Sequence, residues 1–507
     1  MSMLLGLDLG TQGAKGLLID GSGRIKASNF APFSMVTPHP GWAEQDPQDW
    51  WRALVQVIRG IISESGEDPS AIAAIGLSGH MHGPALIDES GAPLCPCVLW
   101  LDTRSEKESD FILKTMGQDI VRITGNPVIS AYTAPKLLWI KKNWHSTFER
   151  INKVLFSKDY VRLHLTGDVA TDYSDASGSL LFDIQKRCWS HDILDTLGIP
   201  YEYMPDIKES LNIAGRVSDR AAAETGLAAG TPVVVGAGDL ACGLIGSGAI
   251  DTGVVSLIIG TAGQIMAVSD VPSEEGFGKV YHFCHAVPDK YFVLGALLSG
   301  GICLRWFRDV LGVGEKLVSE FAGLDAYDLL SKEASQARPG SEGLIFMPYL
   351  AGTGTPYLDS RARGGFIGLT LRHGRPEMVR SIMEGIAYGL RDSIQLFRDV
   401  GFSISQVRVA GGGIKSRLWR QILAEVFASP VIPLETVDAS PLGAALLAGV
   451  GIGMYRSLDE ASQAVVRVGE PLDPIPRNVE VYESCYNIYT SLYSALRDSF
   501  ARWPSPS

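Results

Sequence analysis

Residues 5–20 read LGLDLGTQGAKGLLID, two apolar runs separated by a glycine-containing turn. The first run, within residues 4–11, is typical of a buried strand that ends in a turn, and residues 14–19 continue as a second strand. Residues 20–23, Asp-Gly-Ser-Gly, favour another hairpin turn before a third strand at residues 24–30. We therefore expect the chain to open with three strands joined by tight turns.

The opening segment has a second copy near the middle of the chain. Residues 255–270 read VSLIIGTAGQIMAVSD and align with residues 5–20 without a gap. The identical pairs are Leu7/Leu257, Gly10/Gly260, Thr11/Thr261, Gly13/Gly263 and Asp20/Asp270. Because the copy lies halfway along the chain, it predicts two related α/β domains with a boundary near residues 243–252. The alternative is a chance similarity between two glycine turns.

Other segments extend this α/β pattern. Residues 49–63 place apolar side chains at helical spacing, and residues 479–503 have the pattern of an amphipathic helix. Short apolar runs predict buried strands at 72–77, 233–235 and 407–410.

Composition narrows the class of protein. The chain has 507 residues, enough for two or more domains, and a formal net charge of −12. An acidic chain without a basic run is not expected to bind nucleic acid or an anionic membrane. The first residues carry no basic side chain, so no signal peptide is predicted, and seven scattered cysteines suit a reducing compartment. A cytoplasmic location follows from these features.

Asp8 and Thr11 flank the first glycine turn. Backbone N–H groups and a hydroxyl in such a turn can bind phosphate oxygens, and the carboxylate can hold Mg²⁺ directly or through water. The second copy keeps Gly260 and Thr261 but has Ile258 in the place of Asp8. Two phosphate-binding turns with one metal carboxylate fit a nucleotide held between two domains. The alternative is a plain β-hairpin with a turn-favouring aspartate.

A third glycine turn, at residues 411–413, follows the strand predicted at 407–410. Consecutive glycines allow a ligand such as an adenine ring to approach the backbone, although a tight strand-to-helix turn needs them equally. Neither a phosphate-binding Gly-Lys-Ser/Thr loop nor a full dinucleotide fingerprint is present in the sequence.

Asp239 follows the strand predicted at 233–235 and lies beside glycines. A carboxylate at a strand end can accept the hydroxyl proton when a phosphoryl group is transferred to an alcohol. The alternative is that Asp239 caps a helix that starts at Ala241.

His80 and His82 form a His-x-His pair at the end of the strand predicted at 72–77. Such a pair can bind a catalytic metal, with His282 and His285 completing a hydrolase site. No carboxylate ligand stands at a telling spacing, and no Gly-x-Ser-x-Gly elbow of a serine hydrolase occurs. These histidines can equally form hydrogen bonds to a substrate or to the backbone.

Taken together, these segments resemble the FGGY family of carbohydrate kinases over nearly the whole chain, and within it the xylulose kinase branch. Asp8 to Thr11 resembles the first phosphate motif, Gly260-Thr261 the second, residues 411–413 the adenosine motif, and residues 132–139 and 364–384 the two family signatures. Residues 38–47, 158–160 and 282–285 are typical of the branch.

The resemblance implies an actin/hexokinase-like (ribonuclease H-like) α/β fold, with duplicated domains around a central cleft. It implies that residues 1–245 form a sugar- and phosphate-binding domain and residues 246–507 a nucleotide-binding domain. The implied activity is ATP- and Mg²⁺-dependent phosphorylation of the primary hydroxyl of a ketose, with D-xylulose giving D-xylulose 5-phosphate. A homodimer is also expected.

The same resemblance implies roles for single residues. Asp239 would be the general base and Asp8 the metal-associated carboxylate. The sugar would contact Met81, His82, Asp239 and Leu240. ATP would contact Thr11, Gly260, Thr261, Gly412 and Gly413.

Three residues depart from the usual pattern of the branch. Leu240 and Leu101 stand where asparagine is common, and His80 stands where glutamine is common. The substrate could therefore be another ketopentose or a polyol, such as L-xylulose, ribulose or a pentitol. A non-catalytic actin-like scaffold would share the fold and the nucleotide site but not the sugar pocket, and sugar-stimulated ATP consumption would distinguish the two.

Overall fold

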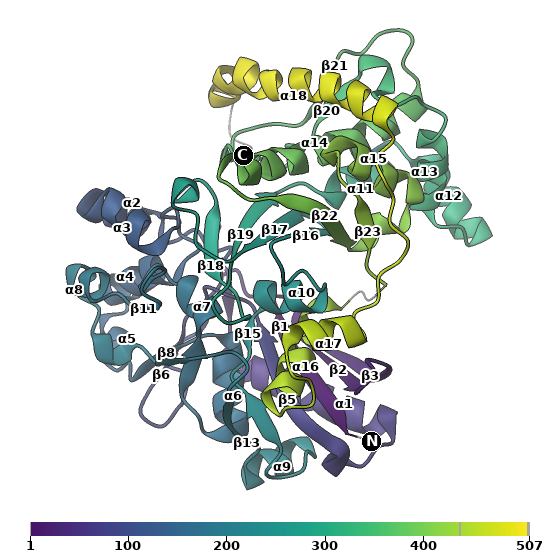
Figure 1. Cartoon of the computed structure of the whole chain (residues 1–507). Coiled ribbons are helices and arrows are strands. Elements are labelled where there is room, and N and C mark those ends of the chain that lie inside the picture. The colour runs from purple at the N-terminus through teal and green to yellow at the C-terminus, as the bar shows by residue number, and fades with distance from the viewer. Residues whose placement is uncertain (1, 436–437, 504–507) are drawn as a thin grey trace. The chain divides into compact units, whose positions relative to one another are not determined.

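The computed structural model describes residues 2–435 and 438–503, which form two compact units (Figure 1). Unit 1 contains residues 2–250, 268–292 and 438–466, and unit 2 contains residues 251–267, 293–435 and 467–503. Each unit is assembled from three separate segments of the chain. A division of function at residue 245 stays a prediction.

Unit 1 is built on a mixed sheet with the strand order β13-β14-β5-β1-β2-β3. The three opening strands predicted from the sequence are confirmed as an antiparallel meander, and β5 and β14 extend the sheet in parallel on the other side of β1. The strands are β1 (Met3–Gly10), β2 (Gly13–Asp20), β3 (Ile25–Pro32), β5 (Ile72–Gly79), β13 (Ile213–Arg216) and β14 (Pro232–Val234).

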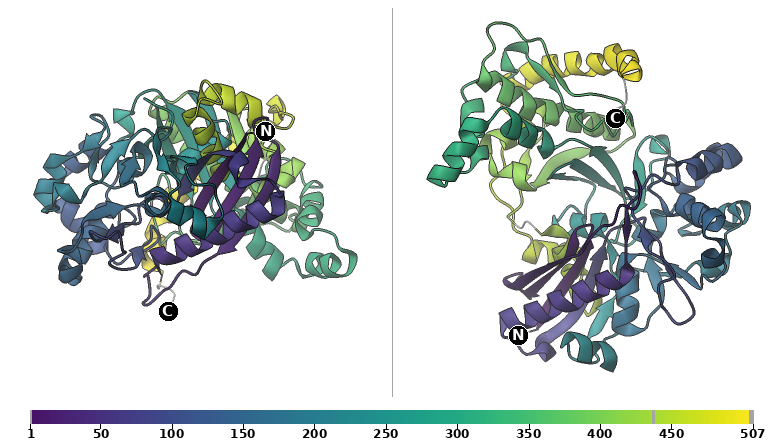
Figure 2. Two further views of the ribbon diagram at one scale, coloured as in Figure 1. Left: turned by 90° about the horizontal axis from the view of Figure 1, so that it is seen from below. Right: turned by 180° about the vertical axis from the view of Figure 1, so that it is seen from behind.

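Several helices pack against this sheet, and two of them make the most extensive contact with it. Helix α1 (Pro47–Ser65) covers β2 and β3 (Figure 2). Its N-terminus is capped by Asp46, which accepts a hydrogen bond from Gln48 N–H. Helix α16 (Ala439–Gly451) lies against β1 and β5. A Cβ at Gly6 or Gly76 would lie 1.8 Å from a carbonyl oxygen of α16, so only glycine permits this close approach.

Unit 2 repeats the arrangement of strands. The second sheet, most of which lies in unit 2, has the order β18-β19-β17-β16-β22-β23, in which β16 is antiparallel to β17 and parallel to β22. Strand β18 falls within residues 268–292, which belong to unit 1. The strands are β16 (Gly253–Ile259), β17 (Gly263–Ser269), β18 (Tyr281–Cys284), β19 (Tyr291–Leu297), β22 (Ile404–Ala410) and β23 (Val431–Pro433). The duplicated, actin-like α/β fold expected from the sequence is therefore confirmed.

The two hairpins differ by one residue in register. In unit 1, Leu9 pairs with Ala14 and Gly10 with Gly13. In unit 2, Ile259 pairs directly with Gly263, because the turn there contains three residues. The second strands begin at the aligned residues Gly13 and Gly263, so the ungapped alignment holds, but it does not predict which residues pair across the second hairpin.

Two long helices, α14 (Arg375–Asp399) and α18 (Pro476–Arg502), belong to unit 2 (Figure 1). Buried Glu384 on α14 accepts hydrogen bonds from Arg380 Nε at 2.8 Å and from Tyr482 Oη on α18 at 2.8 Å. The end of the second family signature therefore lies in the core of unit 2. Across residues 2–435 and 438–503, no helix is long and apolar enough to cross a membrane.

Candidate functional site

Asp8 lies near the end of β1, within a small polar group. Ser78 Oγ on β5 donates a 2.6 Å hydrogen bond to Asp8 Oδ1, and Lys15 lies directly opposite Asp8 on β2. Lys15 also forms an ion pair with Asp438, just before α16. Burial raises the pKa of Asp8 above its ordinary value, while the Ser78 hydrogen bond and Lys15 partly oppose that rise.

Asp239 is the first residue of α10 (Asp239–Gly246), directly after β15 (Ala237–Gly238). It does not cap the helix, because the N-cap position is Gly238. The Leu240 N–H donates a 2.9 Å hydrogen bond to Asp239 Oδ1, and Ser440 Oγ donates to the Asp239 carbonyl at 3.1 Å.

The pKa of Asp239 is raised to about 7, first by burial and then by the negative charge of Asp8. The topology of the sheet brings Asp8 and Asp239 to the same place, because β1 and β15 both run parallel to β5 and end at the same edge of the sheet. Asp239 can therefore exchange a proton near neutral pH, which suits a general base.

Met81 packs against Gly238, the residue before Asp239, and His82 follows Met81 in the chain. Met81 is buried, and a Cβ built on Gly238 would lie 2.7 Å from Met81 Cγ. His82 Nδ1 lies 2.7 Å from the Gly178 carbonyl oxygen, which can only accept a hydrogen bond. The proton of the neutral ring is therefore on Nδ1, and Nε2 presents a lone pair. Burial lowers the pKa of His82 to about 3, so the ring is neutral at pH 7.

The first family signature holds the backbone of His82. This residue has a left-handed φ of 72°, a conformation that costs energy in a non-glycine residue. Its carbonyl accepts hydrogen bonds from Thr133 Oγ1 at 3.0 Å and from Lys136 Nζ at 3.3 Å, both on α4 (Thr133–Asn143). Lys136 Nζ also donates to the Ala131 carbonyl at 2.5 Å. Residues 132–139 thus support the strained histidine.

Thr11 is held from two sides. Gln45 Nε2 donates to its carbonyl at 2.7 Å, and Trp100 Nε1 donates to its hydroxyl at 3.2 Å. Since the Thr11 oxygen accepts from Trp100, its own proton is free to point elsewhere. A cavity of about 530 Å³ adjoins the turn, and Leu101 is among its lining residues.

His80 and Leu240 differ in their accessibility. His80 is 1% exposed, packs against Trp50 at a ring distance of 5.1 Å, and has no hydrogen-bond partner for either ring nitrogen in the described chain. Leu240 is partly exposed on α10, next to Asp239. Leu240 therefore has access to solvent that His80 lacks.

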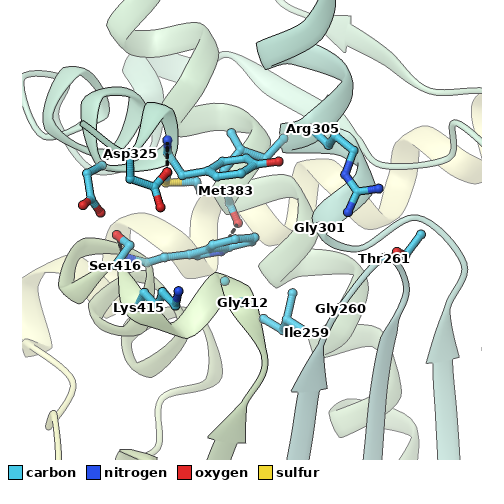
Figure 3. A pocket seen from close by; sticks show the side chains of 15 residues that line it. Ile259, Gly260, Thr261, Gly301, Arg305, Asp325, Met383, Gly412, Lys415 and Ser416 are labelled. Carbon is cyan, nitrogen blue, oxygen red and sulfur yellow. Dashed lines mark hydrogen bonds between the residues drawn. The ribbon is translucent and has the colours of Figure 1, made fainter. Parts of the chain in front are cut away.

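Unit 2 contains a cavity of about 440 Å³, shown in Figure 3. Four of the predicted ATP-contacting residues line it: Gly260, Thr261, Gly412 and Gly413. Apolar walls come from Met383 on α14 and from Trp419 on α15 (Arg417–Phe427), whose Nε1 donates to the Met383 carbonyl at 3.3 Å. The cavity therefore offers flat apolar surface next to glycine backbone.

The cavity has two chemically different ends (Figure 3). Arg305, from α11 (Gly301–Val310), and Thr261 lie at one end, whereas Asp325, Lys415 and Ser416 lie at the other. The first end carries positive charge without an aspartate, which suits phosphate oxygens, and the second combines a cation with an aspartate and a hydroxyl, which suits polar groups of mixed kind. The sequence reasoning missed Arg305 and Trp419, because neither belongs to a recognisable short motif.

The donor set fits magnesium better than a hydrolytic zinc. In the described parts of the chain, no group of three or more His, Cys, Asp or Glu side chains is arranged to hold a metal. The His80–His82 pair thus lacks the further ligands that the hydrolase hypothesis needs. Mg²⁺ is commonly bound by one or two carboxylates together with substrate phosphates, and Asp8 is such a carboxylate.

A duplicated actin-like fold, with paired carboxylates in one unit and a nucleoside-sized cavity in the other, defines the class of ATP-dependent small-molecule kinases. Comparison with protein families makes this assignment specific. Residues 3–246 match the N-terminal domain and residues 255–452 the C-terminal domain of the FGGY family of carbohydrate kinases. The chain belongs to this family and is a carbohydrate kinase.

Individual relatives cover the whole chain. The xylulose kinase of Bacillus subtilis (strain 168) is 34% identical over 498 residues, covering 98% of each chain. The gluconokinase of the same organism is 30% identical over 504 residues, covering 99% of this chain and 97% of the relative. The crystal structure of xylulose kinase from Rhodospirillum rubrum superposes with a TM-score of 0.90 at 30% identity, covering 99% of this chain and 100% of that one.

Proposed function

We propose that this carbohydrate kinase transfers the terminal phosphoryl group of ATP to the primary hydroxyl of a ketose, converting D-xylulose to D-xylulose 5-phosphate. The observation that carries the proposal is Asp239, a carboxyl with a pKa of about 7 that directly follows Gly238, against which Met81 packs. The similarity to proteins named xylulose kinase supports the choice of sugar.

In the proposed reaction, the sugar lies against Met81 and His82. The Nε2 lone pair of neutral His82 accepts a hydrogen bond from a sugar hydroxyl, since Nδ1 is committed to Gly178. Asp239 takes the proton of the attacking hydroxyl and aligns its oxygen for in-line transfer. The Leu240 N–H holds the carboxylate of Asp239, and the Ser440 hydroxyl holds the Asp239 carbonyl.

The nucleotide is proposed to occupy the unit 2 cavity. Its base would lie between Met383 and the glycine backbone at Gly412 and Gly413, and its phosphates near Arg305 and Thr261. When bound, Mg²⁺ supplies positive charge to the phosphate oxygens, and Asp8 is the residue that would hold it. Thr11, with its proton free, can donate to a phosphate oxygen.

A second candidate substrate class is another ketopentose, a polyol or a sugar acid. Leu240 favours this second substrate class, because a leucine next to Asp239 cannot form the hydrogen bonds that asparagine forms. The similarity to a gluconokinase is consistent with this alternative. The homodimer and the cytoplasmic location stay predictions.

Leu240→Asn is expected to raise kcat/KM for D-xylulose by about 5-fold or more, since one gained hydrogen bond is worth about 1 kcal/mol. The measurement compares D-xylulose, L-xylulose, D-ribulose, pentitols and gluconate in the wild type and the variant. Leu240→Ala is the control, because it removes the leucine without adding an amide. If the wild type strongly prefers D-xylulose and the Asn variant is no better, Leu240 does not determine specificity.

The activity should depend on the protonation of Asp239. Because only the carboxylate can accept a proton, kcat/KM for the sugar should fall as pH drops through about 7, by about tenfold per unit well below it. ATP affinity measured over the same range is the control, because phosphate groups also titrate near pH 6. A flat profile from pH 5.5 to 8 would remove Asp239 from the role of base.

A further inference from the structure

A group of buried charges lies around Lys158, on α6 (Ser157–Thr166) of unit 1. Lys158 Nζ is 2.7 Å from Asp159, 2.9 Å from Asp172 and 2.8 Å from Asp175, and all four side chains are 0% exposed. Burying so many charges is costly even when they are paired. We call these four residues the Lys158 cluster.

The cluster reaches the backbone next to Asp239 through one serine. Lys158 fixes Asp172 by its Oδ1, and Asp172 Oδ2 accepts a 2.5 Å hydrogen bond from Ser174 Oγ. Since Asp172 Oδ2 is the acceptor of this hydrogen bond, the Ser174 proton points at Asp172. A lone pair of Ser174 Oγ is therefore aimed at Gly238 N–H, which donates to it at 2.9 Å.

Two further contacts join the cluster to the same stretch of backbone. Ser210 Oγ also donates to Asp172 Oδ2, at 3.0 Å, while the Ser210 carbonyl accepts from Gly236 N–H at 2.9 Å. Arg162 Nη1 donates to Asp159 Oδ1 at 2.8 Å and to the Val235 carbonyl at 2.6 Å.

The anchored stretch, residues 235–238, has the sequence Val-Gly-Ala-Gly. None of these side chains can form a hydrogen bond of its own. The contacts from Ser174, Ser210 and Arg162 therefore supplement the backbone pairing of β15 with β5 and the hydrogen bond from Val235 N–H to the Asn212 carbonyl at 2.9 Å. The Ser174 contact is the last of the three before Asp239, only one residue away from it.

We infer that the Lys158 cluster positions the proposed base Asp239, and that Ser174 is the positioning residue that connects the two. The inference rests on the proposed function, because it gives Asp239 the role of base. Without the Ser174 hydroxyl, the Gly238 N–H loses its partner, and the start of α10 can shift relative to Met81 and His82. A displacement of about 1 Å at a reacting group can cost about 100-fold in rate.

The test uses the full-length chain with Ser174→Ala. We expect kcat to fall by about 10- to 100-fold, while the Kd for ATP, measured by calorimetry, stays within twofold of the wild type. Ser179→Ala is the matched control: Ser179 is a buried serine whose hydroxyl bonds only Ala176 and Leu181 locally among the described residues. Thermal unfolding of each variant reports whether it is folded.

A double variant separates positioning from general damage. In the Asp239→Asn background, Ser174→Ala should cause less than a twofold further loss, because the residue that it positions is already disabled. An equal loss in both backgrounds, or a loss in Ser174→Ala no larger than in Ser179→Ala, would overturn the inference. If Asp239→Asn alone retains normal turnover, the proposed function fails instead, so the two failures are distinguishable.

Discussion

Asp239→Asn is expected to yield a folded protein that binds ATP normally and has lost nearly all sugar phosphorylation. The loss of a general base typically costs about 10²- to 10⁴-fold in rate. Asparagine keeps the shape of the side chain and can still accept the hydrogen bond from Leu240 N–H, but it cannot take a proton. The defect should therefore appear in kcat and not in the Kd for ATP.

The control is Asp219→Asn. Asp219 is also the first residue of a helix, α9 (Asp219–Thr225), but it is exposed and lies outside the carboxylate pair. Both variants remove one negative charge at the same helical position, so only Asp239→Asn should affect turnover. The melting temperature of Asp239→Asn at pH 8 should equal or exceed that of the wild type, because burial disfavours the Asp239 carboxylate in the folded protein. Near-normal turnover in Asp239→Asn would contradict the assignment of the base.

Local patterns were sufficient to predict the opening meander, α1 and the strands at 72–77 and 407–410. In these segments, each apolar run or helical spacing agrees with the burial that the fold imposes. The register of the second hairpin was not predictable in this way. The turn of the second hairpin is one residue longer than that of the first. The sequence pattern is the same for either pairing register, so it does not indicate which residues lie opposite each other.

The packing of α16 against the sheet of unit 1 was not predictable from local sequence either, because it joins segments far apart in the chain. Gly6 and Gly76 are needed because the backbone of α16 approaches them closely, yet α16 begins more than 400 residues after Gly6. Neither glycine carries a local signal that names its partner. The ion pair between Lys15 and Asp438 also joins segments far apart in the chain, and Asp438 is a further carboxylate near Asp8, besides Asp239, that the sequence did not indicate.

In the candidate site, short motifs marked the residues expected to meet ligands, and the structure adds their supports. Asp8 and Asp239 were predicted from strand ends, while Ser78 and Ser174 lack any motif of their own. In the sequence, Lys158 belongs only to a segment, residues 158–160, that is typical of the xylulose kinase branch. Supporting residues act through hydrogen bonds between segments far apart in the chain, so only the folded structure identifies them.

Asp8→Ala and Ile258→Ala, at equivalent positions of the two hairpins, are expected to have different effects on activity and on its Mg²⁺ dependence. Asp8 ends up beside Ser78 and Asp239, whereas Ile258, at the equivalent position of β16, is apolar and pairs with Ala410 on β22. We expect Asp8→Ala to lower kcat/KM by about 100-fold or more, since charge stabilisation by a metal is worth several kcal/mol. The Mg²⁺ concentration for half-maximal rate should also rise.

Ile258→Ala is the matched control, because it introduces the same residue at the equivalent position of the other hairpin. It should act through packing alone, lowering the melting temperature while leaving the Mg²⁺ dependence unchanged. The residual activity of Asp8→Ala adds an independent readout. The charge of Asp8 is the second cause of the raised pKa of Asp239, so its removal should move the acidic limb of the pH profile below pH 7. Equal changes in Mg²⁺ dependence in both variants, with no shift of that limb, would mean that Asp8 neither holds the metal nor faces Asp239.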